Sequence, residues 1–316
     1  MSPDCFYRIF RFQDGLPGTG ARAGRVLLAA YTLQVLCACS YGHPLVGVLP
    51  ENSRLPDDAL SSALLVSALA SPPEGLAEGV PVGERIYVTD ATADVLIRFD
   101  DMTGTQRVSY DGGALGTPFV NPAGVATDSA GRIYVAAADR IYRFDDMSGA
   151  GQVEYDGSAG TPFGRLRAIA IDHSDRIYVT DNMLTRLYRF DDMSGTNQQE
   201  LSGGWSNPQG VAVDALGRIY LVSTALNRLY RFDDMTGAGQ VIYTGSAGTA
   251  FSGPFNVRLD SLERIYVSDF NRDLVYRFDD MSGTNQLEYD GAAGTALSGP
   301  RGLAIDRLDR VFLTDT

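Results

Sequence analysis

The sequence of 316 residues contains no lysine, two histidines and three cysteines. All 26 basic residues are arginine, which excludes a Schiff-base lysine and a lysine general base. The two histidines, His43 and His173, are too few for a metal site built from several imidazoles. The cysteines Cys5, Cys37 and Cys39 all precede residue 40, so the rest of the chain can form no internal disulfide or thiolate metal site.

Positive charge is also scarce, and the chain carries a net charge of -13. The segment through Cys39 has four arginines and two aspartates, or +2, which leaves -15 for the remainder. Nucleic acids and anionic membranes both require a basic face that neutralises phosphates. We therefore expect no nucleic-acid partner, and no electrostatic attachment to a membrane.

A tetrad of arginine, an aliphatic residue, an aromatic residue and another aliphatic residue recurs six times. The tetrads begin at Arg85, Arg132, Arg176, Arg218, Arg264 and Arg310, at spacings of 47, 44, 42, 46 and 46 residues. Within each period recur four short β-branched or aromatic runs, such as GVAVD, RIYLV, RLYRFD and QVIY in residues 210–243. Four strands per period of this length predict an all-β, six-bladed β-propeller of four-stranded antiparallel blades.

Residues 207–234, NPQGVAVDALGRIYLVSTALNRLYRFDD, resemble an NHL repeat. The shared pattern is Pro-x-Gly before an alternating strand that ends in Asp, then a Tyr-containing strand, then Arg and Phe-Asp. The resemblance extends from about residue 79 to residue 316. It implies a six-bladed propeller from a group that includes binding modules, calcium-dependent lactonases and certain lyases, so the fold alone does not give the function.

The first 39 residues admit two interpretations. Arg22 and Arg25 precede an apolar run, Val26–Leu36, which is followed by Cys-Ala-Cys. This order is typical of a signal peptide, and the run is too short to span a bilayer. Leu36–Cys39 also resembles a bacterial lipobox in which Cys39 would be acylated, so we expect an extracytoplasmic protein that is secreted, periplasmic or lipid-anchored.

The second interpretation is structural. Tyr7–Asp14, YRIFRFQD, resembles the third strand of the repeat, while residues 302–306 and 310–315 supply only two strands of a sixth blade. Residues 7–14 and 25–31 could complete that blade, in which case the leader is retained and the protein is cytoplasmic. A third interpretation is that the sixth blade stays incomplete.

Residues 40–78 are expected to form a tether between the leader and the propeller. Acidic residues from Asp57 favour the start of a short helix that continues to Ala70, and Ser71–Gly75 would end it. Gly79–Val82 would then be a short first strand. These boundaries place the propeller at residues 79–316.

An Asp-Asp-Met-Ser/Thr-Gly sequence follows the third run of five repeats. Its carboxylates and hydroxyl could bind calcium, but five near-identical copies favour a hairpin turn capped by aspartate.

The paired arginines of the third run, such as Arg186 and Arg189, recur with aspartates, and we expect ion pairs that join neighbouring blades. We predict no resident cofactor, with calcium as the alternative.

A binding site requires asymmetry, so the informative positions are those where one copy departs from the others. Two residues after the Asn or Gly that precedes the first run, the repeats carry Ala123, Arg167, Gln209, Phe255 and Arg301. The resemblance implies that this run lines the central channel.

The fifth copy departs further within the first run. Arg258 replaces an alanine found in the other copies, and Asn256 replaces a small residue two positions earlier. We take Arg167, Gln209, Asn256, Arg258 and Arg301 as a candidate site for a small anionic ligand. The alternative is that Arg258 pairs with an aspartate inside the ring.

Catalysis has weaker support. A calcium-dependent lactonase would need a glutamate in the channel, and Glu154, Glu200 and Glu288 fall on the fourth run instead. Trp205, in the shortest repeat, is either an exposed anchor for a partner or a plug on its blade. We expect a monomeric, non-enzymatic propeller that binds a protein, glycan or small anion; a metal-dependent hydrolase and a structural spacer are the alternatives.

Overall fold

The computed structural model describes residues 6–10, 64–68, 85–102, 104, 106–291 and 296–315, with the backbone alone for the first two ranges. In this part of the chain the regular elements are β-strands and one 3-10 turn, η2 (Gly113–Leu115). Within these ranges no helix has both the length and the apolar character needed to cross a bilayer. The all-β prediction is confirmed.

Five antiparallel sheets have four strands each, and each sheet follows the chain without a crossover. Their strands are β2 (Leu64–Ala68), β3 (Ile86–Asp90), β4 (Val95–Phe99) and β5 (Val108–Tyr110); β6 (Pro122–Thr127), β7 (Ile133–Ala137), β8 (Arg140–Phe144) and β9 (Val153–Tyr155); β10 (Leu166–Ile171), β11 (Ile177–Asp181), β12 (Arg186–Phe190) and β13 (Gln199–Ser202); β14 (Pro208–Val213), β15 (Ile219–Ser223), β16 (Arg228–Phe232) and β17 (Val241–Tyr243); and β18 (Pro254–Leu259), β19 (Ile265–Asp269), β20 (Leu274–Phe278) and β21 (Leu287–Tyr289).

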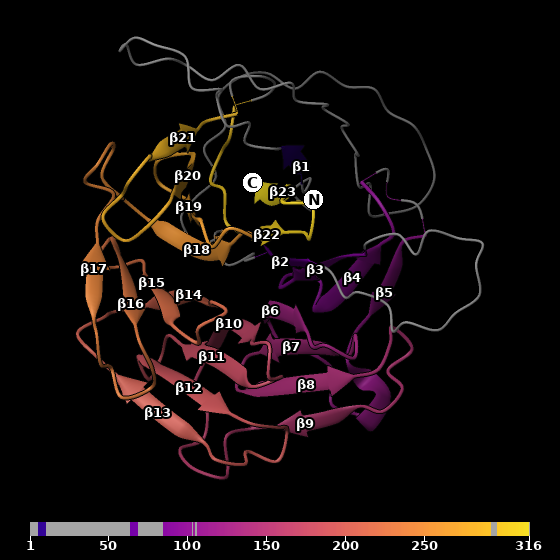
Figure 1. Ribbon diagram of the computed structural model, residues 1–316. Coiled ribbons are helices and arrows are strands. Elements are labelled where there is room, and N and C mark those ends of the chain that lie inside the picture. The colour runs from indigo at the N-terminus through magenta and orange to yellow at the C-terminus, as the bar shows by residue number, and fades with distance from the viewer. Residues whose placement is uncertain are drawn as a thin grey trace.

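The first strand of each sheet lies innermost, and successive inner strands are neighbours around a central axis (Figure 1). The order is β2, β6, β10, β14, β18 and β22 (Leu303–Ile305), and β22 also contacts β2. The sheets therefore close into a propeller around a channel, which removes the exposed edge that an open array of sheets would leave.

The structure shows five complete blades rather than the six that the repeat spacing predicts. The last repeat supplies two strands, β22 and β23 (Val311–Asp315), and the third strand of that sheet is β1 (Phe6–Phe10). β1 runs antiparallel to β23, with Phe10 opposite Val311. The proposed fourth strand at residues 25–31 lies outside the described residues.

The innermost strand of the first blade differs from the expectation. Residues 64–68, which we expected to be helical, form β2 and pair with β3. The expected strand at Gly79–Val82 lies outside the described residues. The acidic start and the Ser-Pro-Pro end suggested a helix, but the edge of β3 offers a whole row of hydrogen-bonding groups to a strand. That tertiary pairing prevails over the local signals.

In the second to fifth blades, a loop side chain covers the aromatic residues of the blade. In the third blade Phe163 packs on Tyr188 and Phe190, with ring centroids 5.0 and 6.2 Å apart. Trp205 occupies this place in the fourth blade: it is 5% exposed, lies 5.4 Å from the Phe232 ring, and donates Nε1–H to a backbone carbonyl over 3.0 Å. Trp205 is therefore a plug, and the prediction of an exposed anchor is wrong.

The third-strand arginines pair within their own blade. Arg189 contacts Asp191 at 2.5 Å, and Arg186 pairs with Glu200 on β13 of the same sheet. The prediction that these pairs join neighbouring blades is wrong, because both side chains lie along the sheet surface toward the outer strands.

Other polar contacts join the blades. At the outer strands, Tyr155 donates its hydroxyl to Gln198 of the next repeat, and Tyr243 donates to Gln286 in the same way. Near the ends of the inner strands, Ser129 donates its amide to Asp175 of the following blade over 2.9 Å. These inter-blade hydrogen bonds have uncharged donors, and an ion pair of 3.2 Å between Arg218 and Glu263 also joins the fourth blade to the fifth.

The Asp-Asp-Met segments are turns. In the second blade Asp146 accepts the amide of Ser148 over 2.8 Å, and Gly149 follows at a φ of +80°. A side chain at Gly149 would also collide with the hydroxyl of Tyr110. Both the positive φ and this close contact therefore require glycine at this position. The turn interpretation is confirmed. Among the described residues no cluster of three histidine, cysteine or acidic side chains is arranged to hold a metal ion.

Candidate functional site

The inner strands of the second to fifth blades present equivalent residues to the channel. The second residues of these strands are Ala123, Arg167, Gln209 and Phe255, and the fifth are Ala126, Ala170, Ala212 and Arg258. Arg301 and Ala304 take the corresponding places at β22. The candidate residues therefore lie at two levels of the channel: Arg167 and Arg301 at the end where the inner strands begin, and Arg258 toward the end where they finish.

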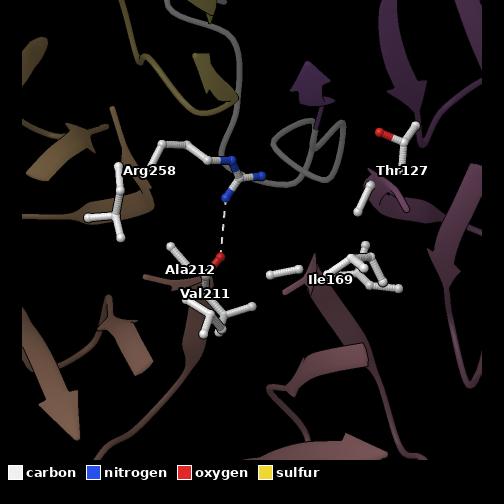
Figure 2. Close-up of a pocket in the computed structure, with 10 residues that line it drawn as sticks. Thr127, Ile169, Val211, Ala212 and Arg258 are labelled. Carbon is white, nitrogen blue, oxygen red and sulfur yellow. Dashed lines mark hydrogen bonds between the residues drawn. The ribbon is translucent and has the colours of Figure 1, made fainter. Parts of the chain in front are cut away.

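A cavity of about 230 Å³ lies between β6, β10, β14 and β18, at the level of Arg258 (Figure 2). Its wall is aliphatic apart from Thr127 and Arg258, and Figure 2 shows the arginine reaching from β18 into the space between the strands. The wall residues are Ala126, Thr127, Ile169, Ala170, Ile171, Val211, Ala212, Val213, Arg258 and Leu259.

One nitrogen of Arg258 makes all the hydrogen bonds of its guanidinium. Nη1 donates to the carbonyl of Val257 over 2.8 Å, to Oδ1 of Asn256 over 2.9 Å and to the carbonyl of Val211 over 3.2 Å. Within the described part of the chain, Nε and Nη2 have no acceptor, and no carboxylate forms an ion pair with Arg258. The Nε–Nη2 edge presents two parallel donors, the geometry that matches a carboxylate.

Asn256 holds this arrangement. Its side chain is fully buried, and its Oδ1 also accepts the amide of Val257 over 2.8 Å. Its Nδ2 is buried with no acceptor among the described residues. The neighbouring strand fits closely: a Cβ at Gly210 would lie 2.8 Å from the Asn256 backbone.

Arg258 is surrounded by protein, although the channel leaves part of its side chain accessible to water. Burial lowers its pKa to about 10, so the guanidinium remains charged at neutral pH. Among the described residues no aspartate pairs with Arg258, so the expected partner inside the ring is not found there. Asp260, two residues later, pairs with Arg264 at 2.5 Å and accepts the hydroxyl of Tyr266.

The other level holds Arg167 and Arg301. The Arg301 guanidinium lies 4.3 Å above the Phe270 ring and 5.3 Å from that of Phe255. Burial, together with the positive charges of Arg165 and Arg301, lowers the pKa of Arg167 to about 10. Gln209 donates its amide to Asn207 over 2.8 Å.

The structure thus divides the predicted site. Arg258 and Asn256 form one unit, and Arg167 and Arg301 belong to a second unit at the opposite end of the inner strands. Sequence reasoning missed Arg165 and Phe270. Both depart from their repeats, since Arg165 stands where other copies have Asn121 or Gly253, so a wider search for departures would have found them.

The remaining candidates have ordinary surroundings. His173 is exposed in a turn. Glu154 pairs with Arg140 at 2.9 Å, and Glu288 accepts from Thr249, both on outer strands. Cys39 lies outside the described residues.

Comparison with known proteins shows the fold alone. No family model and no curated protein matches the chain. Among solved structures, an inactive virginiamycin B lyase from Staphylococcus aureus with quinupristin is 17% identical over 79% of this chain and 80% of its own, with a TM-score of 0.55. A putative gluconolactonase is 13% identical over 82% and 96%, with a TM-score of 0.54. A nidogen/laminin complex is 19% identical over 70% and 80%, with a TM-score of 0.55. These similarities support a β-propeller, and the NHL family is not confirmed.

Proposed function

We propose that this protein is a non-enzymatic propeller that binds a small carboxylate with an apolar tail in the channel beside Arg258. The observation that supports this is the Nε–Nη2 edge of Arg258, which has no protein acceptor among the described residues. A charged group surrounded by protein is costly unless an opposite charge reaches it, and a ligand can supply that charge.

The cavity limits the rest of the ligand. Eight of its ten wall residues have aliphatic side chains that can contact a short hydrocarbon tail, and backbone polar atoms, Thr127 and Arg258 make up the rest of the wall. The burial of apolar surface contributes roughly 25 cal/mol per Å². On the measure by which one water needs about 10–15 Å³, the cavity has about 230 Å³, so it has room for a small organic acid. Hexanoate matches this size and charge.

An enzymatic function has less support from these positions. The alternative is a metal-dependent hydrolase, and its required glutamate would lie in the channel. Glu154 and Glu200 instead form ion pairs on the outer strands of their blades. The wall of the Arg258 cavity contains no acid or imidazole among the described residues, which favours binding over acid–base chemistry.

Thermal unfolding with paired ligands tests the proposal. Hexanoate should raise the melting temperature, and hexanamide, which has the same shape without the charge, should not. At a concentration 100 times Kd the expected stabilisation is about 2.7 kcal/mol. Equal shifts with the two compounds, or no shift with hexanoate at millimolar concentration, would count against a carboxylate site.

We further propose that the protein is a six-bladed, NHL-type propeller and that it is extracytoplasmic. The N-terminus of the mature chain tests the last part of this proposal. Cleavage of the leader before an acylated Cys39 would remove Phe6–Phe10, whereas the pairing of β1 with β23 needs that strand. An intact mass that corresponds to a chain starting at a lipid-modified Cys39 would support the lipid-anchored proposal. A mass for residues 1–316 would contradict it and would support closure of the sixth sheet by β1.

A further inference from the structure

The cavity beside Arg258 has a second polar side chain in its wall, that of Thr127. Thr127 ends β6, and Arg258 comes from β18, which is three places away in the ring of six inner strands. The two strands therefore face each other across the channel. Figure 2 shows the two side chains on opposite sides of the cavity, with the hydroxyl oxygen of Thr127 on the side toward Arg258.

Thr127 departs from the repeat, as Arg258 does. The equivalent residue is aliphatic in the other inner strands whose sequence follows the repeat, where it is Ile171, Val213, Leu259 and Ile305. Threonine and valine have nearly the same shape, and both suit a strand. The change to threonine therefore keeps the packing of the strand and adds one hydroxyl to the cavity wall.

The hydroxyl of Thr127 is left for a ligand within the described part of the chain. It forms no hydrogen bond to another described residue, and the side chain is half-buried, so channel water reaches it. A ligand that displaces this water without a hydrogen-bonding group of its own leaves the hydroxyl unpaired, which costs free energy. A ligand with a polar group at this place avoids that cost.

The charges around the cavity limit what that polar group is. Arg258 is the one charged side chain in the described wall, and the carboxylate of the ligand already balances it. A second carboxylate or an ammonium group beside Thr127 would have no counter-ion in a confined space, which is unfavourable. An uncharged hydroxyl both donates and accepts, as the hydroxyl of threonine does, so the two groups are complementary.

We propose that the ligand of the Arg258 cavity is a short ω-hydroxy acid. Its carboxylate binds Arg258, its terminal hydroxyl binds Thr127, and an aliphatic chain lies between them along the aliphatic part of the wall. This inference rests on the proposed function, which supplies the carboxylate and the apolar chain, and it adds the specificity for the far end of the ligand. Thr127 is then the residue that determines this specificity.

Calorimetric titration at pH 8 with pairs of acids tests the inference. The hydroxy acids 4-hydroxybutanoate, 5-hydroxypentanoate and 6-hydroxyhexanoate are each compared with the unsubstituted acid of the same number of carbons. At the chain length that spans the cavity, the hydroxy acid should bind at least threefold more tightly than its unsubstituted counterpart. Adipate and 6-aminohexanoate carry a charge in place of the hydroxyl and should bind more weakly than 6-hydroxyhexanoate.

Two variants assign the preference to Thr127. Thr127→Val should fold, because valine occurs at the equivalent Val213. In this variant the preference should reverse: the unsubstituted acid should bind at least threefold more tightly than the hydroxy acid, and at least as tightly as it binds the unaltered protein. Thr127→Ser is the matched control, since it keeps the hydroxyl and should retain the preference for the hydroxy acid.

The results separate a failure of this inference from a failure of the proposed function. Unsubstituted acids that bind as tightly as the hydroxy acids, or more tightly, at all three lengths would overturn the role of Thr127 and leave the carboxylate site in place. An unchanged preference in Thr127→Val would do the same. If none of these acids binds, the carboxylate site itself is contradicted, and this inference is overturned with it.

Discussion

Arg258 and Asn256 are joined by a hydrogen bond of 2.9 Å between Nη1 and Oδ1, and both replace the small residues of other repeats. One substitution introduces the charge, and the other supplies the acceptor that orients it. Because Asn256 and two carbonyls occupy Nη1, the opposite edge of the guanidinium is left for the cavity. Two departures within one strand therefore produce a single asymmetric feature in a nearly symmetric ring.

Arg258→Ala should stabilise the ligand-free protein. The change restores the residue found at Ala126, Ala170 and Ala212, and it removes a charge that burial makes unfavourable. We expect a gain of about 1 to 3 kcal/mol in the free energy of unfolding. Urea denaturation measures it, with Arg228→Ala as the exposed control. A loss of stability would show that Arg258 holds the ring together.

Asn256→Ala should show how much the orientation of Arg258, as distinct from its charge, contributes to ligand affinity. Alanine occurs at this position in the third blade as Ala168, so the backbone accommodates it. Loss of the Oδ1 acceptor should cost about 1 kcal/mol of ligand affinity, or roughly fivefold. Calorimetric titration of hexanoate checks this, and unchanged affinity would mean that the two carbonyls suffice to orient Arg258.

Stability should fall at alkaline pH because buried tyrosines resist ionisation. Burial and the negative charge of Asp172 raise the pKa of Tyr178 to about 12, and burial raises that of Tyr220 to about 12. In the unfolded chain these groups ionise near pH 10. Their contribution is complete below pH 10 and is lost as pH rises toward 12, on the order of 1 kcal/mol for each tyrosine. Denaturation from pH 9 to 11.5 measures the slope.

Two variants test whether Tyr178 and Tyr220 cause the loss of stability at alkaline pH. Tyr178→Phe and Tyr220→Phe remove the ionisable hydroxyls and should flatten the dependence on pH. The same slope in the double variant would attribute the alkaline loss to other groups.

Trp205 should be a strong contributor to stability. Trp205→Ala removes a buried ring and a hydrogen bond, with an expected loss of about 3 to 5 kcal/mol. Trp205→Phe copies the residue found at Phe163 and Phe251 and should lose less than half of that. As the single tryptophan, Trp205 should also give blue-shifted fluorescence in the folded protein. Water-like emission from the native state would contradict its burial.

Sequence reasoning found the features that every repeat shares. Strand positions, the Asp-Asp-Met turn and the buried aromatics recur, and each copy performs the same packing, so repetition reveals them. The first blade is the exception. Its inner strand, Leu64–Ala68, lacks the Pro-x-Gly start, and only its pairing with β3 identifies it.

The site was predictable in part for the same reason. Departures from the repeat identified Arg167, Arg258 and Arg301, but one-dimensional comparison could not show which of them meet. The separation of Arg258 from the other two follows from its place three residues further along an inner strand than Phe255, whereas Arg167 and Arg301 both lie at the position of Phe255 in their own repeats.

Calorimetric titration of hexanoate into the unaltered protein, Arg258→Ala and Arg228→Ala tests the central claim most directly. The account predicts that the unaltered protein and Arg228→Ala bind hexanoate with affinities within twofold of each other. Arg258→Ala should bind at least tenfold more weakly, although it folds more stably. Equal affinity in Arg258→Ala would contradict the claim that this guanidinium receives the ligand.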